Sequence, residues 1–441
     1  MHRDEASIAR WLESFVSRAG DIAEVFAERL HETRVEWRDG QAREVRVRRE
    51  EGTCARWRTG SREQLVLVPG ADEGAAREAV RALRSEGGRG ALPCRSGSPS
   101  EPVETPASAD LERWSKRLGA LFARHAPRHR FTWRVLDVER RVVVPDHPPE
   151  GSSRRLVSLE GRFLAASRLL DEERAFSFHS PETDSTADEL RALLGAAAAP
   201  RDRPTVVPEG RMDVLLAEGC AAVLFHEILG HALEADAELS PLAGLKEARV
   251  AVPELEVVDD ARRLDLFGGY ERDDEGTLPR AVRLIHGGGV GSRLTDRAHA
   301  GANGSSGHGR RAGPGEAPRP RGSNVIVRAG SATPEEMVRR LQNGIRIEEF
   351  HAGSVELANG TFRLEFGRAR RIRRGRLADE LGAGVLAGEI LSALESIEPV
   401  LGREVHVCRN FGWCARAGQV VPVQGAAPDV LIRGLMLRPA T

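Results

Sequence analysis

The sequence lacks long apolar runs. No stretch reaches the roughly 18 consecutive apolar residues that a membrane-spanning helix requires, although 40% of the 441 residues are hydrophobic. Residues 1–6 also lack the apolar core that marks a secretory signal peptide. We therefore expect a cytoplasmic protein that has no membrane partner.

Lysine is nearly absent, since only Lys116 and Lys246 occur and almost every basic residue is arginine. The 65 basic and 66 acidic residues are interspersed along the chain, which has a net charge of −1. Proteins that bind nucleic acid present a strongly basic face. The composition therefore predicts no nucleic-acid partner.

Cysteine is scarce, and its spacing shows no paired ladder. An odd number of cysteines in a reducing compartment indicates free thiols or a metal ligand rather than a disulfide framework. The five residues are Cys54, Cys94, Cys220, Cys408 and Cys414.

Length and hydrophobic patterning predict an α+β fold with antiparallel sheets. We expect an N-terminal α+β domain over 1–86, a Gly-, Ser- and Pro-rich linker over 87–107 and a second α+β domain over 108–207. Short strands and frequent glycines over 208–441 indicate a β-rich, barrel-like C-terminal domain. The candidate metal-binding residues described below also lie in this domain.

Individual elements follow from the periodicity of apolar residues and from turn and cap signals. Asp39-Gly40 is a hairpin turn signal, and Thr333 before Pro334 predicts a capped helix over 334–341. The other expected helices are 8–19, 71–84, 110–124, 186–198 and 386–394. The expected strands before residue 220 are 23–29, 33–38, 43–50, 54–59, 63–68, 131–136, 140–144, 154–159, 161–165, 174–178 and 212–216.

Residues 301–323 are rich in glycine, arginine and proline. This composition predicts a flexible surface loop. The alternative is a lid over a binding site, because long loops in compact domains often serve as lids.

Residues 221–236 combine apolar and ionisable side chains in one helical segment. The apolar residues surround nearly the whole helix, which predicts a helix buried in a large core. His226, Glu227 and His231 would then lie in an apolar environment, where an unpartnered polar group costs roughly 2–7 kcal/mol. A metal ion is one partner that satisfies all three side chains.

The spacing of the two histidines is unusual for a metal-binding helix. On a regular α-helix, residues at i and i+5 point about 140° apart, which is too divergent to share one ion. Gly230 precedes His231 and removes a β-carbon where the helix must widen. We therefore expect a single π-helical turn between the histidines.

The segment LFHEILGHALEAD (224–236) resembles the signature helix of the TldD/PmbA metallopeptidases, whose active members carry the pattern H-E-x-x-x-H. Segments 258–260, 273–277 and 412–423 agree with the same family in order. The resemblance implies a zinc bound by the two helix histidines and by a cysteine near the C-terminus, with the helix glutamate as general base. By position these residues are His226, His231, Cys414 and Glu227.

The residues alone leave the third zinc ligand open. Glu234 and Asp236 follow the motif on the same segment, and Glu234 would give a His₂Glu site. Cys408 and Cys220 would serve as well as Cys414 if only burial mattered. The resemblance favours Cys414, and Glu234 would then orient an imidazole.

These observations predict a zinc-dependent metallopeptidase that cleaves peptides or unfolded polypeptides, as a homodimer or as a heterodimer with a paralogous subunit. Two alternatives are a non-catalytic partner subunit and a peptide-binding protein with a structural zinc. The intact residues His226, Glu227 and His231 argue against the partner subunit. The natural substrate, cleavage preference and pathway do not follow from the sequence.

Overall fold

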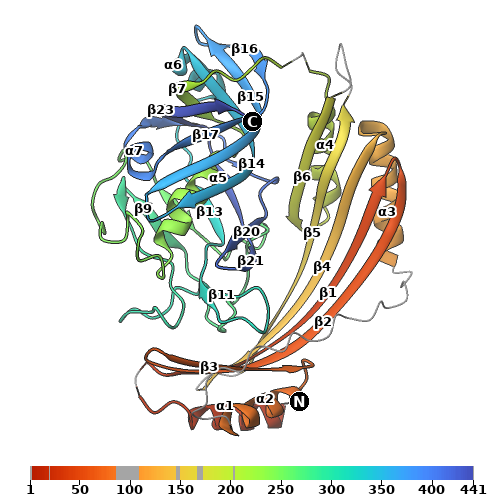
Figure 1. Cartoon of the computed structure of the whole chain (residues 1–441), viewed down its shortest axis with the longest axis vertical. Coiled ribbons are helices and arrows are strands. Elements are labelled where there is room, and N and C mark those ends of the chain that lie inside the picture. The colour runs from red at the N-terminus through yellow and green to blue at the C-terminus, as the bar shows by residue number, and fades with distance from the viewer. Residues whose placement is uncertain are drawn as a thin grey trace.

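The computed structural model describes residues 2–18, 20–85, 109–145, 149–165, 172–201 and 204–440. The chain has a mixed α+β fold rich in antiparallel sheet (Figure 1). The predicted linker over 87–107 and Cys94 lie outside the described residues. None of the described helices has both the length and the apolar character needed to cross a membrane.

A six-stranded antiparallel sheet forms the N-terminal half and curves along one side of the C-terminal half (Figure 1). Its strand order is β3-β2-β1-β4-β5-β6. The strands are β1 (Ile22–Arg38), β2 (Gln41–Thr59), β3 (Arg62–Pro69), β4 (His129–Val143), β5 (Glu150–Ala165) and β6 (Glu172–Pro181).

The two segments predicted as separate N-terminal units share this one sheet. β1 pairs with β2 along one edge and with β4 along the other, from Val25↔Val143 to Arg38↔Arg130. The pairing with β4 satisfies backbone groups that would otherwise form an exposed edge. The strands of 1–86 and of 108–207 therefore belong to one sheet, which the pattern of a single strand does not reveal. The domain boundary over 87–107 stays a prediction.

Several predicted short strands are halves of longer ones. β1 covers both 23–29 and 33–38, and its pairing with β2 runs unbroken through Leu30↔Glu50 and Glu32↔Arg48. Polar residues in the middle of each strand interrupt the apolar pattern, which suggested that the strand ended there. These residues are partly exposed but form no turn, so the strand continues through them. The predicted turn at Asp39-Gly40 is confirmed, since both residues have positive φ (50° and 80°).

Four helices cover this sheet. α1 (His2–Glu13) and α2 (Glu73–Ser85) share a small core with β1 and β2, while α3 (Ala109–His125) and α4 (Thr186–Ala198) share a larger one with β4 to β6. The larger core is aromatic, and Trp114 lies 4.5 Å from Trp133 between ring centroids.

The C-terminal half contains two larger sheets with one helical segment between them. The first has the order β14-β7-β23-β17-β15-β16, and β18 pairs with β23. Because β14 also pairs with β15, the strands β14, β7, β23, β17 and β15 form a closed series of pairings. The barrel-like description stays a prediction. The strands are β7 (Gly210–Leu216), β14 (Gly344–Glu356), β15 (Thr361–Arg373), β16 (Arg376–Leu381), β17 (Gly384–Glu389), β18 (Ile397–Leu401) and β23 (Val430–Pro439).

The second sheet has the order β10-β9-β8-β13-β22-β19. α5 (Ala221–Phe225) packs between the two sheets, and residues of all three form one continuous core. The strands are β8 (Val257–Asp259), β9 (Val282–His286), β10 (Gly289–Val290), β13 (Asn324–Val327), β19 (His406–Val407) and β22 (Gln424–Ala427). Two hairpins stand apart, β11 (Gly309–Arg310) with β12 (Arg319–Pro320), and β20 (Trp413–Arg416) with β21 (Gln419–Pro422).

Of the two helices predicted after residue 330, the first is confirmed and the second is helical only in its last residues. α6 (Pro334–Leu341) has the expected cap, in which the side chain of Thr333 accepts a hydrogen bond from the backbone N–H of Glu336. The segment 386–394 begins as strand β17 and becomes helical only in α7 (Ile390–Glu395). Its apolar residues suit a buried strand as well as a helix, and pairing with β15 and β23 selects the strand.

The segment 301–323 is not a surface loop. Residues 301–304 are exposed, but Arg310, Arg311 and Arg321 are among the largest fully buried side chains of the described chain. Arg311 donates hydrogen bonds to the carboxylate of Glu24 on β1 and to the backbone of Asp274. The composition favours a surface loop because arginine is usually solvent-exposed. Arg311 and Arg321 instead lie beside the buried carboxylates of Glu24 and Glu234, which composition does not reveal.

Candidate metal centre

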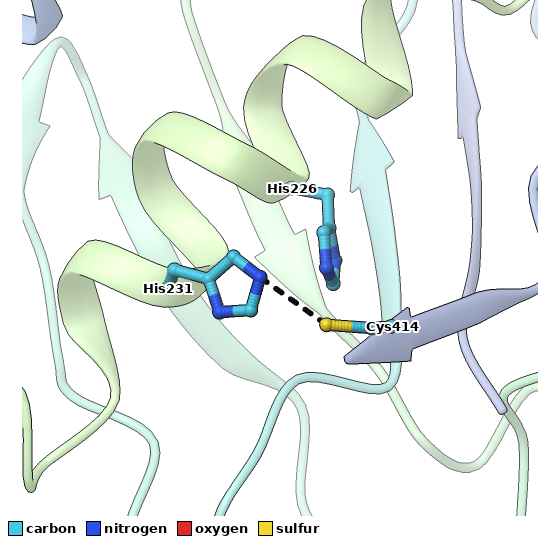
Figure 2. A group of neighbouring side chains, drawn as sticks. All are labelled: His226, His231 and Cys414. Atoms are coloured by element: carbon cyan, nitrogen blue, oxygen red, sulfur yellow. Dashed lines mark hydrogen bonds between the residues drawn. The ribbon is translucent and has the colours of Figure 1, made fainter. Parts of the chain in front are cut away.

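The two motif histidines lie on a widened helical turn. After α5 the chain continues as the π-helical turn η1 (His226–Gly230) and the 3₁₀ turn η2 (His231–Leu233). The backbone N–H of His231 donates to the carbonyl of His226, five residues earlier, and the ring centroids are 4.8 Å apart. The predicted π turn is confirmed, and it brings both imidazoles to one side (Figure 2).

Cys414 reaches the same point from a distant part of the chain. It lies on β20, in a hairpin that turns through Ala417 and Gly418 at positive φ. Its Sγ is 3.2 Å from Nε2 of His231 (Figure 2). Donor atoms of Cys414, His226 and His231 all lie within 4.8 Å of one another, and the three side chains are buried.

This arrangement fits a metal ion. His226 is 1% exposed, and neither of its ring nitrogens has a hydrogen-bond partner among the described residues. Leaving such groups unpaired in a core is costly. A tetrahedral zinc places nitrogen and sulfur ligands about 3.5 Å apart, close to the separation of the His231 and Cys414 donors.

Electrostatics favour a thiolate at this position. Burial opposes ionisation of Cys414, but His231 and His226 beside the sulfur hold its pKa well below the usual range. A thiolate is the form of cysteine that binds metals. The donor set is therefore two imidazoles and one anionic sulfur, a combination that suits zinc.

The rival ligands lie elsewhere. The Sγ of Cys408 is 3.0 Å from Oδ1 of Asn410, and the Sγ of Cys220 donates to the carbonyl of Ile347. Asp236 accepts a hydrogen bond from Arg416 at 2.6 Å.

Glu234 supports His231 from behind. One carboxylate oxygen lies 3.4 Å from Nδ1 of His231, the nitrogen opposite the one that faces Cys414. Burial raises the pKa of Glu234, but His231, Arg416 and Arg321 outweigh burial and hold the pKa below its usual value. An anionic carboxylate behind a ligating imidazole fixes the orientation of the ring, which is the second role considered for Glu234 above.

Two arginines complete the surroundings and were not predicted individually. Arg416 donates to the carboxylates of Glu234 and Asp236, and Arg321 donates to Cys414. The only sequence signal for Arg321 was the arginine-rich composition of 301–323. That composition does not distinguish Arg321 from its neighbours.

Glu227 is placed beside the three donors. One of its carboxylate oxygens lies 4.0 Å from Nε2 of His231, and the side chain is largely buried. Burial raises the pKa of Glu227, and His231 and His226 offset this only in part. A carboxylate with a raised pKa is better matched to proton transfer near neutral pH.

A cavity of about 390 Å³ gives access to the centre. Glu227, His231 and Cys414 line one wall, and residues 350–355 of β14 line another. The backbone of Gly353 passes close to Glu227, because a β-carbon built there would lie 2.8 Å from a carboxylate oxygen of that side chain. A molecule in this cavity would contact Glu227 together with His231 and Cys414.

The other two segments that carry the resemblance, 258–260 and 273–277, contain buried acidic side chains that bind residues from distant parts of the chain. Asp259 accepts from Nε2 of His308 and from the backbone of Ser323. Asp274 and Glu275 join the N-terminal sheet through Arg140 and Arg56. These contacts hold the chain around the centre and supply none of its donor atoms.

The sequence is similar to a family and to several proteins. The family described as "PmbA/TldA metallopeptidase C-terminal domain" matches residues 209–438. A "Metalloprotease" of Methanothermobacter thermautotrophicus is 30% identical over 254 residues, or 57% of this chain and 55% of that protein. The "Metalloprotease TldD homolog" of Haemophilus influenzae is 29% identical over 254 residues, covering 55% and 52%. A "Zinc metalloprotease TldD homolog" of Saccharolobus solfataricus is 24% identical over 234 residues, covering 51% of each.

The match spans about half the length of these curated relatives. Among solved structures, TldE from Thermococcus kodakarensis superimposes with a TM-score of 0.74 at 16% identity, over 98% of this chain and 99% of that one. That likeness shows a shared fold. Because the family match covers more than half of the residues, the chain belongs to the PmbA/TldD metallopeptidase family.

Proposed function

We propose that this protein is a zinc-dependent peptidase that hydrolyses flexible peptides and unfolded polypeptides. One observation carries the proposal. His226, His231 and Cys414 converge within 4.8 Å, and His231, Cys414 and Glu227 line one cavity. A structural zinc needs no general base and no cavity, whereas hydrolysis needs both.

The proposed chemistry divides between the metal and the chain. His226, His231 and Cys414 would hold a zinc, which would supply an activated water and polarise a carbonyl oxygen. Glu227 accepts the proton of the attacking water and returns it to the leaving amine. Glu234 orients the His231 ring from the other side.

Strand β14 offers a place for an extended substrate. Beyond Ile347 its described pairings are with β15, and residues 350–355 line the cavity. The edge of β14 that pairs with no described strand there is therefore open to a substrate in the cavity. The carbonyl of Phe350 already accepts from the side chain of Asn410, which closes the edge at that end. A peptide that pairs with the free edge would pass beside Gly353 and Glu227.

Cleavage should therefore depend on chain access more than on side-chain identity. We expect flexible peptides and a destabilised variant of a small protein to be cleaved while the native form of that protein resists. Supplying an extended segment from a native domain requires local unfolding, which costs up to the whole stability of about 5–15 kcal/mol.

The measurement is parallel digestion of the three substrates by zinc-loaded enzyme, followed by mass spectrometry. Equal rates on the native and destabilised forms would contradict the access argument. No cleavage of any substrate, either by the chain alone or after addition of a paralogous subunit, would contradict the peptidase proposal itself.

Cobalt substitution tests Cys414 as the third ligand. We expect a thiolate-to-cobalt charge-transfer band in the parent protein that is lost in Cys414→Ser, because only a coordinated thiolate produces it. Cys408→Ser and Cys220→Ser are matched controls with buried sulfurs bonded elsewhere, and both should keep the band. A band that survives Cys414→Ser and disappears in either control would place the ligand elsewhere.

A non-catalytic partner subunit is the second candidate, and the fold that this chain shares with TldE does not distinguish it from a peptidase. An inactive partner needs no histidine pair and no buried base, and this chain has both. If the purified chain cleaves peptides only when a paralogous subunit is added, the proposed assembly is a heterodimer. Activity of the chain alone would favour a homodimer or a monomer.

A further inference from the structure

Arg321 is buried between the two parts of the metal centre. Its side chain is 1% exposed, and Nη2 donates to the Sγ of Cys414 at 3.2 Å and to the carbonyl of Cys414 at 3.1 Å. Its Nε lies 3.6 Å from the carboxylate of Glu234, which supports His231. One guanidinium thus contacts the sulfur donor and the carboxylate behind a histidine donor.

A fixed positive charge beside the sulfur changes what the donor set can do. A thiolate gives the site one more negative charge than a third imidazole would, which makes a bound metal less electrophilic. A hydrogen bond from a guanidinium withdraws charge from the thiolate, and burial strengthens the effect because water does not screen it. Arginine keeps its charge under all working conditions.

We infer that Arg321 is a positioning residue for the proposed zinc site, where it offsets the charge of Cys414 and fixes the direction of its sulfur. This inference rests on the proposed function. It assigns to Arg321 a role in metal binding rather than in substrate binding or in closing the cavity.

A purely structural role is the competing explanation. Nη1 of Arg321 also donates to the carbonyls of Arg416 and Gln419, at 3.4 and 3.3 Å, in the turn of the β20–β21 hairpin. If those contacts were all that mattered, losing Arg321 would weaken metal binding equally whether or not residue 414 carries a sulfur. The two explanations therefore differ in their dependence on the thiolate.

The test uses the full chain loaded with cobalt and compares Arg321→Gln, Arg321→Lys and the parent protein. We expect Arg321→Gln to lower cobalt affinity about 10- to 100-fold in competition with a chelator. The thiolate-to-cobalt band should shift to lower energy, because the sulfur lone pairs lose a stabilising hydrogen bond. Arg321→Lys keeps the charge without the fork of donors, so both effects should be smaller.

Arg311→Lys is the matched control, since Arg311 is equally buried in the same segment but binds Glu24 and Asp274. It should leave the affinity and the band unchanged. In a Cys414→His background, which keeps a third donor without an anionic sulfur, the affinity loss caused by Arg321→Gln should shrink, which a double-mutant cycle measures.

Three outcomes would overturn the inference. The first is an unshifted band in both Arg321 variants. The second is an undiminished affinity loss in the Cys414→His background. The third is failure of both Arg321 variants to fold, because the arginine would then serve the hairpin alone. A parent protein without any thiolate band would instead contradict the zinc proposal. The two failures are therefore distinguishable.

Discussion

Glu227→Gln is expected to retain zinc and to lose peptide hydrolysis, with kcat reduced about 10²- to 10⁴-fold. The amide keeps the shape of the side chain but does not accept a proton from water. Zinc should remain because the three donors are His226, His231 and Cys414, and Glu227 is not among them. Elemental analysis and peptide digestion followed by mass spectrometry measure the two properties separately.

Glu256→Gln is a suitable control for this change. The carboxylate of Glu256 bonds His286 and the backbone of Gly287, away from the cavity, so this variant should cleave at the parent rate. If Glu227→Gln also cleaves at the parent rate with zinc bound, Glu227 is not the base. If it loses zinc, the carboxylate contributes to metal binding and the division of roles proposed above is wrong.

The local part of the centre could be predicted from the sequence because its geometry is set within a few residues. A histidine pair at i and i+5 in an apolar helix is compatible with one ion only if the helix widens, and the turn His226–Gly230 does so. A β-carbon at Gly230 would lie 3.4 Å from Nδ1 of His226, which is an ordinary contact, so the space around the turn does not demand a glycine. The spacing of the two histidines was sufficient for this inference.

The non-local part could not be derived in this way. Cys414 is 183 positions from His231, and only the family resemblance singled it out among the buried cysteines. The contacts of Arg321 are made with the hairpin that carries Cys414. Its role is therefore visible only when the positions of 301–323 and of that hairpin are both known. Composition made 301–323 resemble a loop, because it records how many arginines are present and not which carboxylates they meet.

The same limit applies to strand pairing in the N-terminal half. Alternation within β1 and β4 identifies each as a strand, but a strand's pattern does not specify its neighbour. The pairing β1–β4 joins segments on either side of the predicted linker, from Val25↔Val143 onward. Where the partner of a strand is distant in sequence, the residue pattern predicts the strand itself but not the strand with which it pairs.

His226→Ala and His231→Ala should each reduce bound zinc from about one equivalent to near zero, because two remaining ligands do not hold a structural or catalytic zinc firmly. The metal-free forms of the two variants should differ in stability. His226 has no hydrogen-bond partner among the described residues, whereas His231 contacts Cys414 and Glu234. Truncating His231 leaves a buried thiol and a buried carboxylate without their neighbour, so it should destabilise the metal-free chain more than truncating His226 does.

Zinc binds the folded state, so it should raise the unfolding temperature of the parent protein and leave both variants unchanged. Calorimetry with and without zinc, together with elemental analysis, measures both effects. His129→Ala is the control, since His129 is a buried histidine of the N-terminal sheet whose Nδ1 bonds the carbonyl of Ala126. That variant should lose stability yet keep its zinc and its zinc-dependent stabilisation. Full zinc content in both His226→Ala and His231→Ala would refute the metal assignment, and with it the mechanism that depends on Glu227.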